Sequence, residues 1–187
     1  MHNSATDKRE RLIHAAVKLS YRHGFGKTAL ADIAEEADVP LGNVYYYFKT
    51  KEDVGAAVVE QRLLQARALR QSWNKARSPR ERLLASIQST ERQGQSLASG
   101  GCCVGTLCSE LRKEGGALAK KASMLLAEHL DWIEAQFRAL GKKGDARGFA
   151  VHLLSALQGI AVLAHGLRNP KLVRTETSRL KDWLASL

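Results

Sequence analysis

Three cysteines lie close together in the second half of the sequence, namely Cys102, Cys103 and Cys108. A cysteine thiolate can attack an electrophile or become oxidised, and a helix N-terminus or neighbouring basic side chains favour the thiolate. Arg112 and Lys113 are candidate basic neighbours. An odd, clustered set is not the disulfide framework of a small secreted protein, so it indicates a reducing compartment. The alternative is that these cysteines are buried and pack as small hydrophobic residues.

Zinc binding is a second chemistry that three cysteines could support. Adjacent Cys102 and Cys103 have poor spacing for zinc ligands, and His129 is the only histidine near them in the sequence. We therefore expect no metal site and no other cofactor.

A second group of residues has side chains suited to contacts with nucleic acid. Tyrosine hydroxyls can donate hydrogen bonds to phosphate oxygens, and an asparagine can pair with a base edge or a phosphate. A threonine and a lysine stand at expected helix N-termini, where anions are favoured, and a glycine leaves room for close approach. The group consists of Thr28, Gly42, Asn43, Tyr45, Tyr47 and Lys51.

The elements that must position these side chains are helices, because apolar residues recur at helical spacing and no segment alternates with period two. The strongest start signal is Ser78-Pro79-Arg80-Glu81, which combines a capping box with a proline at the first helical position. We predict an all-α fold of about nine helices. They cover about residues 7–23, 28–37, 40–47, 50–75, 78–97 and 106–113, followed by three that end near residues 140, 167 and 187.

Two short expected helices, 28–37 and 40–47, are separated by a tight turn and follow a longer amphipathic helix. This arrangement is typical of a helix-turn-helix, whose second helix enters the DNA major groove. Val44 and Phe48 are four residues apart and share one face of that second helix. The other side chains of the helix are then free to face DNA.

The net charge of +10 at pH 7 indicates an anionic partner, and it favours nucleic acid over a membrane surface. The excess is not concentrated on the expected DNA-binding segment, because residues 1–50 hold seven basic and six acidic side chains. Within that segment the basic residues gather in residues 1–27. An ordinary solvated basic face is the alternative interpretation.

The sequence from about residue 8 to 55 resembles the DNA-binding segment of the TetR family of bacterial transcriptional repressors. The resemblance is carried by Thr28, Asp32-Ile33-Ala34, Ala37, Val39, Gly42, Val44-Tyr45-Tyr46-Tyr47-Phe48 and Lys51-Glu52. It implies a TetR-like homodimer that binds a pseudo-palindromic DNA operator. It also implies a helix-turn-helix domain at 1–50, a linker helix at 51–75, and a ligand-sensing and dimerisation domain at 76–187.

The family pattern further implies roles for single residues. Thr28 and Lys51 would contact phosphates, Leu41 and Asn43 would approach bases, and Tyr45 and Tyr47 would contact the DNA backbone. Leu41 and Gly42 offer few hydrogen-bonding groups, so direct reading of bases by this helix is expected to be sparse.

The segment Gly101–Leu111 resembles the Gly-Cys…Leu…Glu segment of a TetR subgroup that includes repressors responding to reactive electrophiles and oxidants. Cys102 aligns with the cysteine that reacts in that subgroup. The alternative signal is a reversible small-molecule inducer in a helical pocket. A further alternative is that the residues of this segment only pack in the core. The candidate sensor residues are Cys102, Leu107, Leu125, His129 and Trp132.

The last two expected helices carry many small and apolar residues, which suits half of a four-helix dimer interface. The core of the monomer is the alternative place for them. The candidate interface residues are His152, Ala156, Leu157, Ile160 and Trp183.

Two other functional classes fit the sequence less well. A thiol-dependent enzyme needs a base and an orienting group, but the sequence has no glycine-rich phosphate loop, nucleophile elbow or metal motif. A non-specific architectural DNA-binding protein would not need the long segment after Lys51.

The N-terminus is polar, and no run of about 18 apolar residues occurs, so we expect no signal peptide, no membrane partner and a cytoplasmic location.

Overall fold

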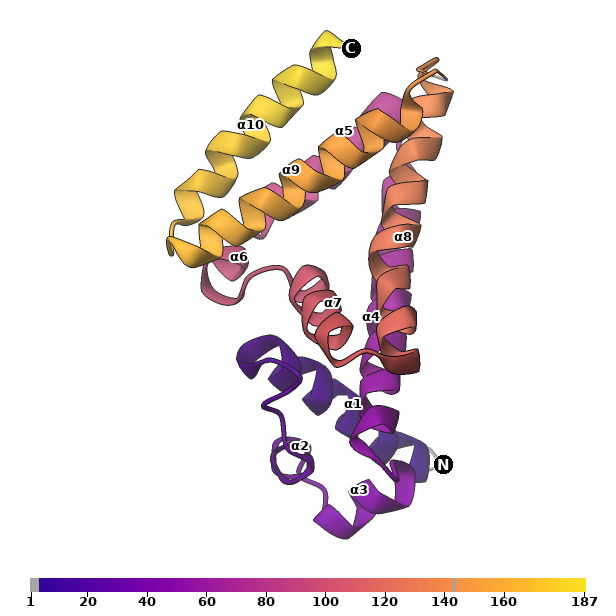
Figure 1. Ribbon diagram of the computed structural model, residues 1–187, viewed down its shortest axis with the longest axis vertical. Helices are drawn as coiled ribbons and strands as arrows, with labels where there is room; N and C mark the ends of the chain where they lie inside the picture. Colours follow the sequence, from indigo (N-terminus) through magenta and orange to yellow (C-terminus); the bar gives the residue numbers. More distant parts are fainter. Residues whose placement is uncertain (1–3, 143) are drawn as a thin grey trace. The chain divides into compact units, whose positions relative to one another are not determined.

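The computed structural model describes residues 4–142 and 144–187, which form ten α-helices and no strand (Figure 1). The expected all-α fold is confirmed. The helices are α1 (Ser4–His23), α2 (Leu30–Glu36), α3 (Leu41–Tyr47), α4 (Lys51–Trp73), α5 (Pro79–Arg92), α6 (Gly94–Gly100), α7 (Cys103–Glu114), α8 (Gly116–Ala139), α9 (Ala146–Gly166) and α10 (Pro170–Ser186).

Side-chain caps fix the starts of α4 and α5 where the sequence predicts them. The Ser78 hydroxyl oxygen accepts a hydrogen bond from the Glu81 backbone N–H at 3.2 Å, and Pro79 is the first residue of α5. At α4, the Thr50 hydroxyl oxygen accepts from the Asp53 N–H, while the Asp53 carboxylate accepts from the Thr50 N–H at 2.9 Å. These bonds satisfy N–H groups that have no partner within the helix.

The expected helix at 78–97 is instead two helices, which accounts for the tenth element. The chain bends at Gln93, which ends α5 and precedes α6. Gly94 follows, and a Cβ there would lie 3.4 Å from the backbone oxygen of Pro170. The close approach of α10 therefore suits a glycine, which is also a poor helix former.

The helix expected at 106–113 begins three residues earlier, at Cys103. Gly101 has a positive φ of 73°, so the tight turn before the helix is completed there.

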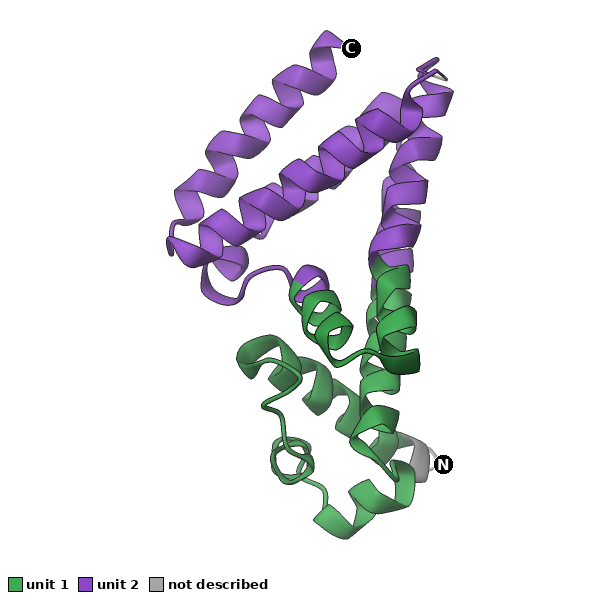
Figure 2. Ribbon diagram, viewed as in Figure 1, with its two compact units in different colours: residues 1–65, 106–125 green, residues 66–105, 126–187 purple. Residues whose placement is uncertain are grey.

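The chain divides into two compact units (Figure 2). Unit 1 comprises residues 1–65 and 106–125, and unit 2 comprises residues 66–105 and 126–187. These units do not coincide with the expected domains 1–50 and 76–187, because parts of α7 and α8 group with the N-terminal helices. The functional roles of those domains stay predictions.

The core of unit 1 holds α1, α2 and α3 together. Leu12, Ile33 and Val44 are buried there, one from each helix. The turn between α2 and α3 contains Asp38, which has a positive φ of 50°. The Arg11 guanidinium donates to the backbone oxygen of Asp38 at 2.7 Å and also to that of Ala37. A side chain of α1 therefore braces the turn that sets α3 against α2.

The core of unit 2 is built from α5, α8, α9 and α10, and its largest buried side chains include Leu83, Phe137, Leu153 and Leu184. Among the described residues, α9 is the one helix whose length and composition would allow it to cross a membrane. One side of α9 packs into this core.

Candidate nucleic-acid interface and sensor region

Helix α3 has one buried face and one open face, as its spacing predicts. Val44 and Phe48 are buried, whereas Leu41 and Tyr45 are exposed. A Cβ at Gly42 would meet nothing within 4 Å, so the backbone is open to a partner at this point. Asn43 and Tyr47 are half-buried at the borders of the open face.

Tyr46 is the most exposed aromatic residue of this helix, with 71% of its surface accessible, and it is not among the contact residues expected from the sequence. Helical spacing does predict this exposure, because a residue two positions after Val44 lies about 200° around the helix from it. The Tyr46 and Tyr47 rings meet edge to face, with centroids 4.9 Å apart. Each tyrosine therefore restricts the other.

Thr28 has a different local role from the expected one. It is buried, and its hydroxyl donates to the backbone oxygen of Gly24 at 2.9 Å. The expectation that Thr28 caps α2 is wrong, because the N-cap residue is Ala29, whose N–H donates to the Asp32 carboxylate at 3.1 Å. The Thr28 N–H also has a partner, the backbone oxygen of Phe25. Its phosphate contact stays a prediction and would require one of these bonds to break.

Lys51 is held against the turn that follows α1. Its ammonium group donates to the backbone oxygen of Gly26 at 2.6 Å and lies 5.3 Å from the centroid of the Phe25 ring. The Glu110 carboxylate accepts hydrogen bonds from the N–H groups of Phe25 and Gly26 in the same turn. The phosphate contact of Lys51 also stays a prediction.

Part of the positive charge in residues 1–27 is neutralised within unit 1. Lys18 forms an ion pair with Glu36 of α2, and the hydrogen bond from Lys18 lowers the pKa of the Glu36 carboxyl below its usual value. Arg11 pairs with Asp38 in the turn. Arg22 and Lys27 are exposed. Some basic side chains of residues 1–27 therefore stabilise the helix-turn-helix through ion pairs. Others are exposed and available to an anion.

Comparisons with known proteins agree with this geometry. Residues 12–58 match the family described as "Bacterial regulatory proteins, tetR family". The HTH-type transcriptional repressor NemR of Escherichia coli K12 is 33% identical over 159 residues, which cover 81% of this chain and 68% of that protein. The chain belongs to the TetR family of bacterial transcriptional regulators.

Solved structures support the same fold for the whole chain. A TetR-family transcriptional regulator from Streptomyces coelicolor has a TM-score of 0.84 at 19% identity, covering 97% of this chain and 96% of that one. The reduced form of E. coli NemR has a TM-score of 0.79 at 21% identity, covering 94% and 96%. The matches identify a helix-turn-helix regulator of transcription.

Cys102 stands at the N-terminus of α7 and takes the place of a capping residue. Its half-buried sulfur accepts a hydrogen bond from the Gly105 N–H at 3.3 Å. A Cβ at Gly105 would lie only 2.5 Å from the side-chain oxygen of Gln158 on α9. Glycine at this position therefore allows the first turn of α7 to lie against α9, and the helix N-terminus faces the sulfur.

Cys108 belongs to the core of unit 1, where it is buried and its thiol donates to the backbone oxygen of Ala122 at 3.1 Å. Cys103 is half-buried in the first turn of α7. The Cys102 sulfur receives a backbone hydrogen bond at the start of α7.

The five candidate sensor residues are divided between the units. Leu107 and Leu125 are buried in unit 1, while Cys102, His129 and Trp132 belong to unit 2. The structure brings His129 and Trp132 together, with ring centroids 6.3 Å apart. A single pocket formed by all five residues stays a prediction.

Trp73 of α4 completes an aromatic cluster with these two residues and is not among the sensor residues expected from the sequence. Its ring centroid lies 5.8 Å from that of His129 and 5.2 Å from that of Trp132. Trp132 also donates from its indole nitrogen to the Asn74 side-chain oxygen at 2.9 Å. The contact joins α4 to α8 within unit 2, and no spacing within either helix would have predicted it.

His129 is the polar member of this cluster, and its Nε2 atom is buried without a hydrogen-bond partner. Nearby Arg70 is buried and donates to the Glu128 carboxylate at 2.6 Å. Burial, and to a lesser extent the charge of Arg70, lower the pKa of His129 to about 4. The imidazole is therefore neutral near pH 7.

The candidate dimer residues fall into two groups. Leu157 and Ile160 are buried in the core of unit 2. His152, Ala156 and Trp183 line a groove of about 430 Å³ between α9 and α10, which Ile160 also borders. The rings of His152 and Trp183 have centroids 4.7 Å apart.

The neutral state of buried His129 generates a prediction about pH. Its folded-state pKa of about 4 lies below the ordinary value of 6.5, so the unfolded chain binds more protons between these two values. We expect the free energy of unfolding to fall as the pH drops from about 6.5 to 4, by about 2–3 kcal/mol from this group. Urea unfolding at several pH values measures this loss.

The His129→Phe variant should lack this part of the pH dependence, because it has no proton to gain. His23→Gln, at an exposed position on α1, is the matched control and should retain it. Identical pH profiles for the wild type and His129→Phe would contradict the prediction.

Proposed function

We propose that the protein is a transcriptional repressor that binds a pseudo-palindromic DNA operator as a homodimer in the cytoplasm. A chemical signal received in the C-terminal part of the chain releases the operator. The observation that carries the proposal is the open face of α3, with Leu41, Tyr45 and Tyr46 exposed opposite buried Val44. The chain is 33% identical to a protein named as a transcriptional repressor, which supports repression rather than activation.

Contact with DNA is assigned to α3 and its flanks. Tyrosine hydroxyls of Tyr45, Tyr46 and Tyr47 contact phosphates, while Asn43 approaches a base edge. Leu41 and Gly42 lie close to the groove without hydrogen bonding. In a dimer, two such helices would enter successive major grooves roughly 34–36 Å apart on one side of the DNA. No enzymatic step is part of this proposal.

The first test of operator binding is selection from a random DNA library, followed by titration of the enriched sequence against a scrambled one. We expect a two-fold symmetric sequence bound at least about 10³ times more tightly than the scrambled control, as for specific DNA-binding proteins. Asn43→Ala should alter the preference among operator variants, whereas Tyr46→Phe should weaken binding to all variants by a similar factor. An architectural DNA-coating protein would instead enrich no symmetric sequence.

Dimerisation is assigned to the exposed sides of α9 and α10. Val162 and Leu163 are 69% and 52% exposed on α9, and an apolar surface of this kind favours a protein interface. The groove between α9 and α10 lies beside them, and Leu163 lines it. A second copy of the chain would cover these side chains in a four-helix arrangement.

Placing charges on this surface should separate the dimer. We expect the double variant Val162→Glu, Leu163→Glu to sediment as a monomer, because carboxylates would have to lose water in the interface. Gln71→Glu, at an exposed position of α4, is a matched charge control and should remain a dimer. A dimeric double variant would place the interface elsewhere.

The signal is assigned to Cys102 in unit 2. Its sulfur receives a backbone hydrogen bond at the N-terminus of α7, where negative charge is favoured. Alkylation or oxidation would add bulk beside Gly105, where even a Cβ would lie 2.5 Å from the Gln158 side-chain oxygen. The second candidate signal is a reversible ligand of the Trp73, His129 and Trp132 cluster, where a buried nitrogen lacks a partner.

A thiol titration tests the signal. We expect N-ethylmaleimide to weaken operator binding by the wild type and by Cys103→Ser, but not by Cys102→Ser, with the modified residue identified by mass spectrometry. The physical reason is that a bulky adduct on Cys102 breaks the cap of α7. Release of the operator at the same dose by Cys102→Ser would favour the reversible ligand instead.

A further inference from the structure

A carboxylate of α7 lies against the turn that connects α1 to α2. Glu110 accepts a hydrogen bond from the Phe25 N–H at 2.7 Å and a longer one from the Gly26 N–H at 3.3 Å. Both residues belong to the loop that leads from the end of α1 to Thr28. All of these residues belong to unit 1, and 85 positions separate the first pair in the sequence.

The turn has the shape that such a carboxylate requires. Gly24 has a positive φ of 85°, and a Cβ built there would lie 2.7 Å from a Glu110 carboxylate oxygen. Glycine at this position therefore both forms the turn and leaves room for Glu110. A backbone oxygen of the same turn, that of Gly26, accepts a hydrogen bond from Lys51 at 2.6 Å.

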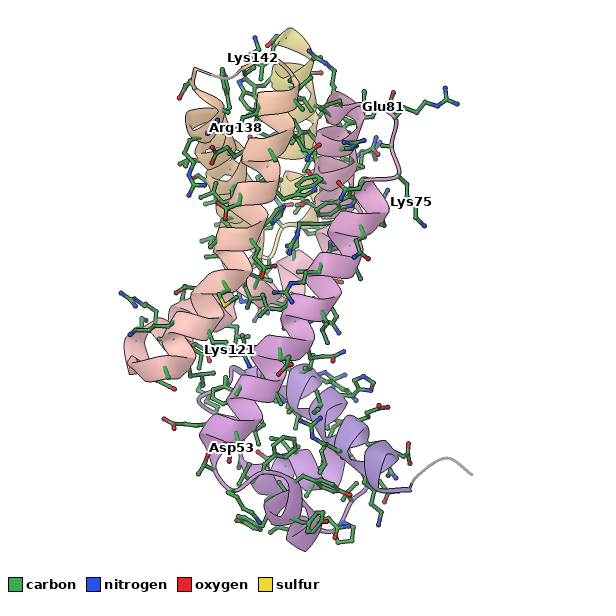
Figure 3. The ribbon with its side chains drawn as sticks, turned by 90° about the vertical axis from the view of Figure 1, so that its right-hand side faces the viewer. Asp53, Lys75, Glu81, Lys121, Arg138 and Lys142 are labelled. Carbon is green, nitrogen blue, oxygen red and sulfur yellow. The ribbon has the colours of Figure 1, made fainter. Side chains whose placement is uncertain are left out.

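The buried side chain of Phe25 anchors the same turn in unit 1. Phe25 is buried, and at Gly55 of α4 a Cβ would lie 2.8 Å from the Phe25 ring and 2.6 Å from a methyl group of Leu118. Parts of α4 and α8 thus close around the turn within unit 1. Lys121 of α8 also pairs with Glu60 of α4 at 3.4 Å. Figure 3 labels Lys121 on its helix.

We infer that Glu110 is a positioning residue for DNA binding, and that it also couples the cysteine end of α7 to the helix-turn-helix. The carboxylate holds the turn from which α2 starts, and α2 in turn packs on α3. The coupling part rests on the proposed function. Helix α7 runs without interruption from Cys103, next to the capping Cys102, to Glu114. A change in the cap therefore acts on the helix that carries Glu110.

A purely electrostatic role and a positioning role of Glu110 predict opposite changes in DNA affinity when its carboxylate is removed. Loss of a negative charge from a DNA-binding unit should by itself strengthen attraction to phosphates. Loss of the two hydrogen bonds should instead release the turn and weaken operator binding. Glu114 is the matched control, because it lies one helical turn further along α7, is exposed, and also approaches Gly26, with an oxygen 3.8 Å from a Cβ built there.

The experiment measures affinity for the selected operator with four proteins: the wild type, Glu110→Ala, Glu110→Gln and Glu114→Ala. We expect Glu110→Ala to bind about tenfold more weakly, as expected for loss of charge-assisted hydrogen bonds. Glu114→Ala should bind as tightly as the wild type or more tightly. Glu110→Gln should stay within about threefold of the wild type, because its amide oxygen can accept the same bonds.

Two further measurements separate positioning from general destabilisation. Amide hydrogen exchange at Phe25 and Gly26 should become faster in Glu110→Ala, while the unfolding midpoint stays close to that of Glu114→Ala. The slope of affinity against salt should be unchanged, since Glu110 contacts no phosphate. Equal operator affinity of Glu110→Ala and Glu114→Ala would overturn the positioning role.

The coupling role is tested with N-ethylmaleimide as the probe. If Glu110 transmits the change, modification should weaken operator binding much less in Glu110→Ala than in the wild type, because the turn is already released. An equal loss in both proteins would overturn the coupling. If the wild type itself binds the operator equally well before and after modification, the electrophile signal of the proposed function and this coupling both fail. The comparison of unmodified Glu110→Ala and Glu114→Ala still decides the positioning role.

Discussion

The DNA-binding part of this chain depends on a helix that is too short to be stable by itself. Helix α3 has seven residues, about two turns, and isolated helices shorter than about 12–15 residues are marginal in water. Its place is therefore set by the burial of Val44 and Phe48 in the core of unit 1. Because those two side chains point inward, positions 42 and 46 lie on the outer side of the helix, so the open face follows from the buried one.

The elements were largely predictable because their signals are local. Helical spacing places Val44 and Phe48 on one face, and the serine and proline at positions 78 and 79 mark the start of α5 as observed. Thr28 shows where local rules fail. A threonine before an apolar run is typical of an N-cap, but its hydroxyl donates instead to the backbone oxygen of Gly24, in the turn that follows α1.

The candidate site residues were less predictable because their partners are distant in sequence. Lys51 donates to Gly26, which lies 25 positions away, and Trp132 contacts Trp73 and Asn74 of another helix. Spacing on α8 correctly put His129 and Trp132 on one side of that helix. It could not show that Leu125, one turn earlier, belongs to a different compact unit.

Net charge was informative about the class of partner but not about the place of contact. Unit 1 carries 13 basic and 11 acidic side chains, whereas unit 2 carries 16 and 8. Most of the excess thus lies outside the unit that contains the helix-turn-helix. Within unit 1, Glu36 and Asp38 are paired with Lys18 and Arg11, so acidic residues of this region brace its helices. Attraction to DNA there depends on which basic side chains remain exposed, and that is fixed by pairing between helices rather than by composition.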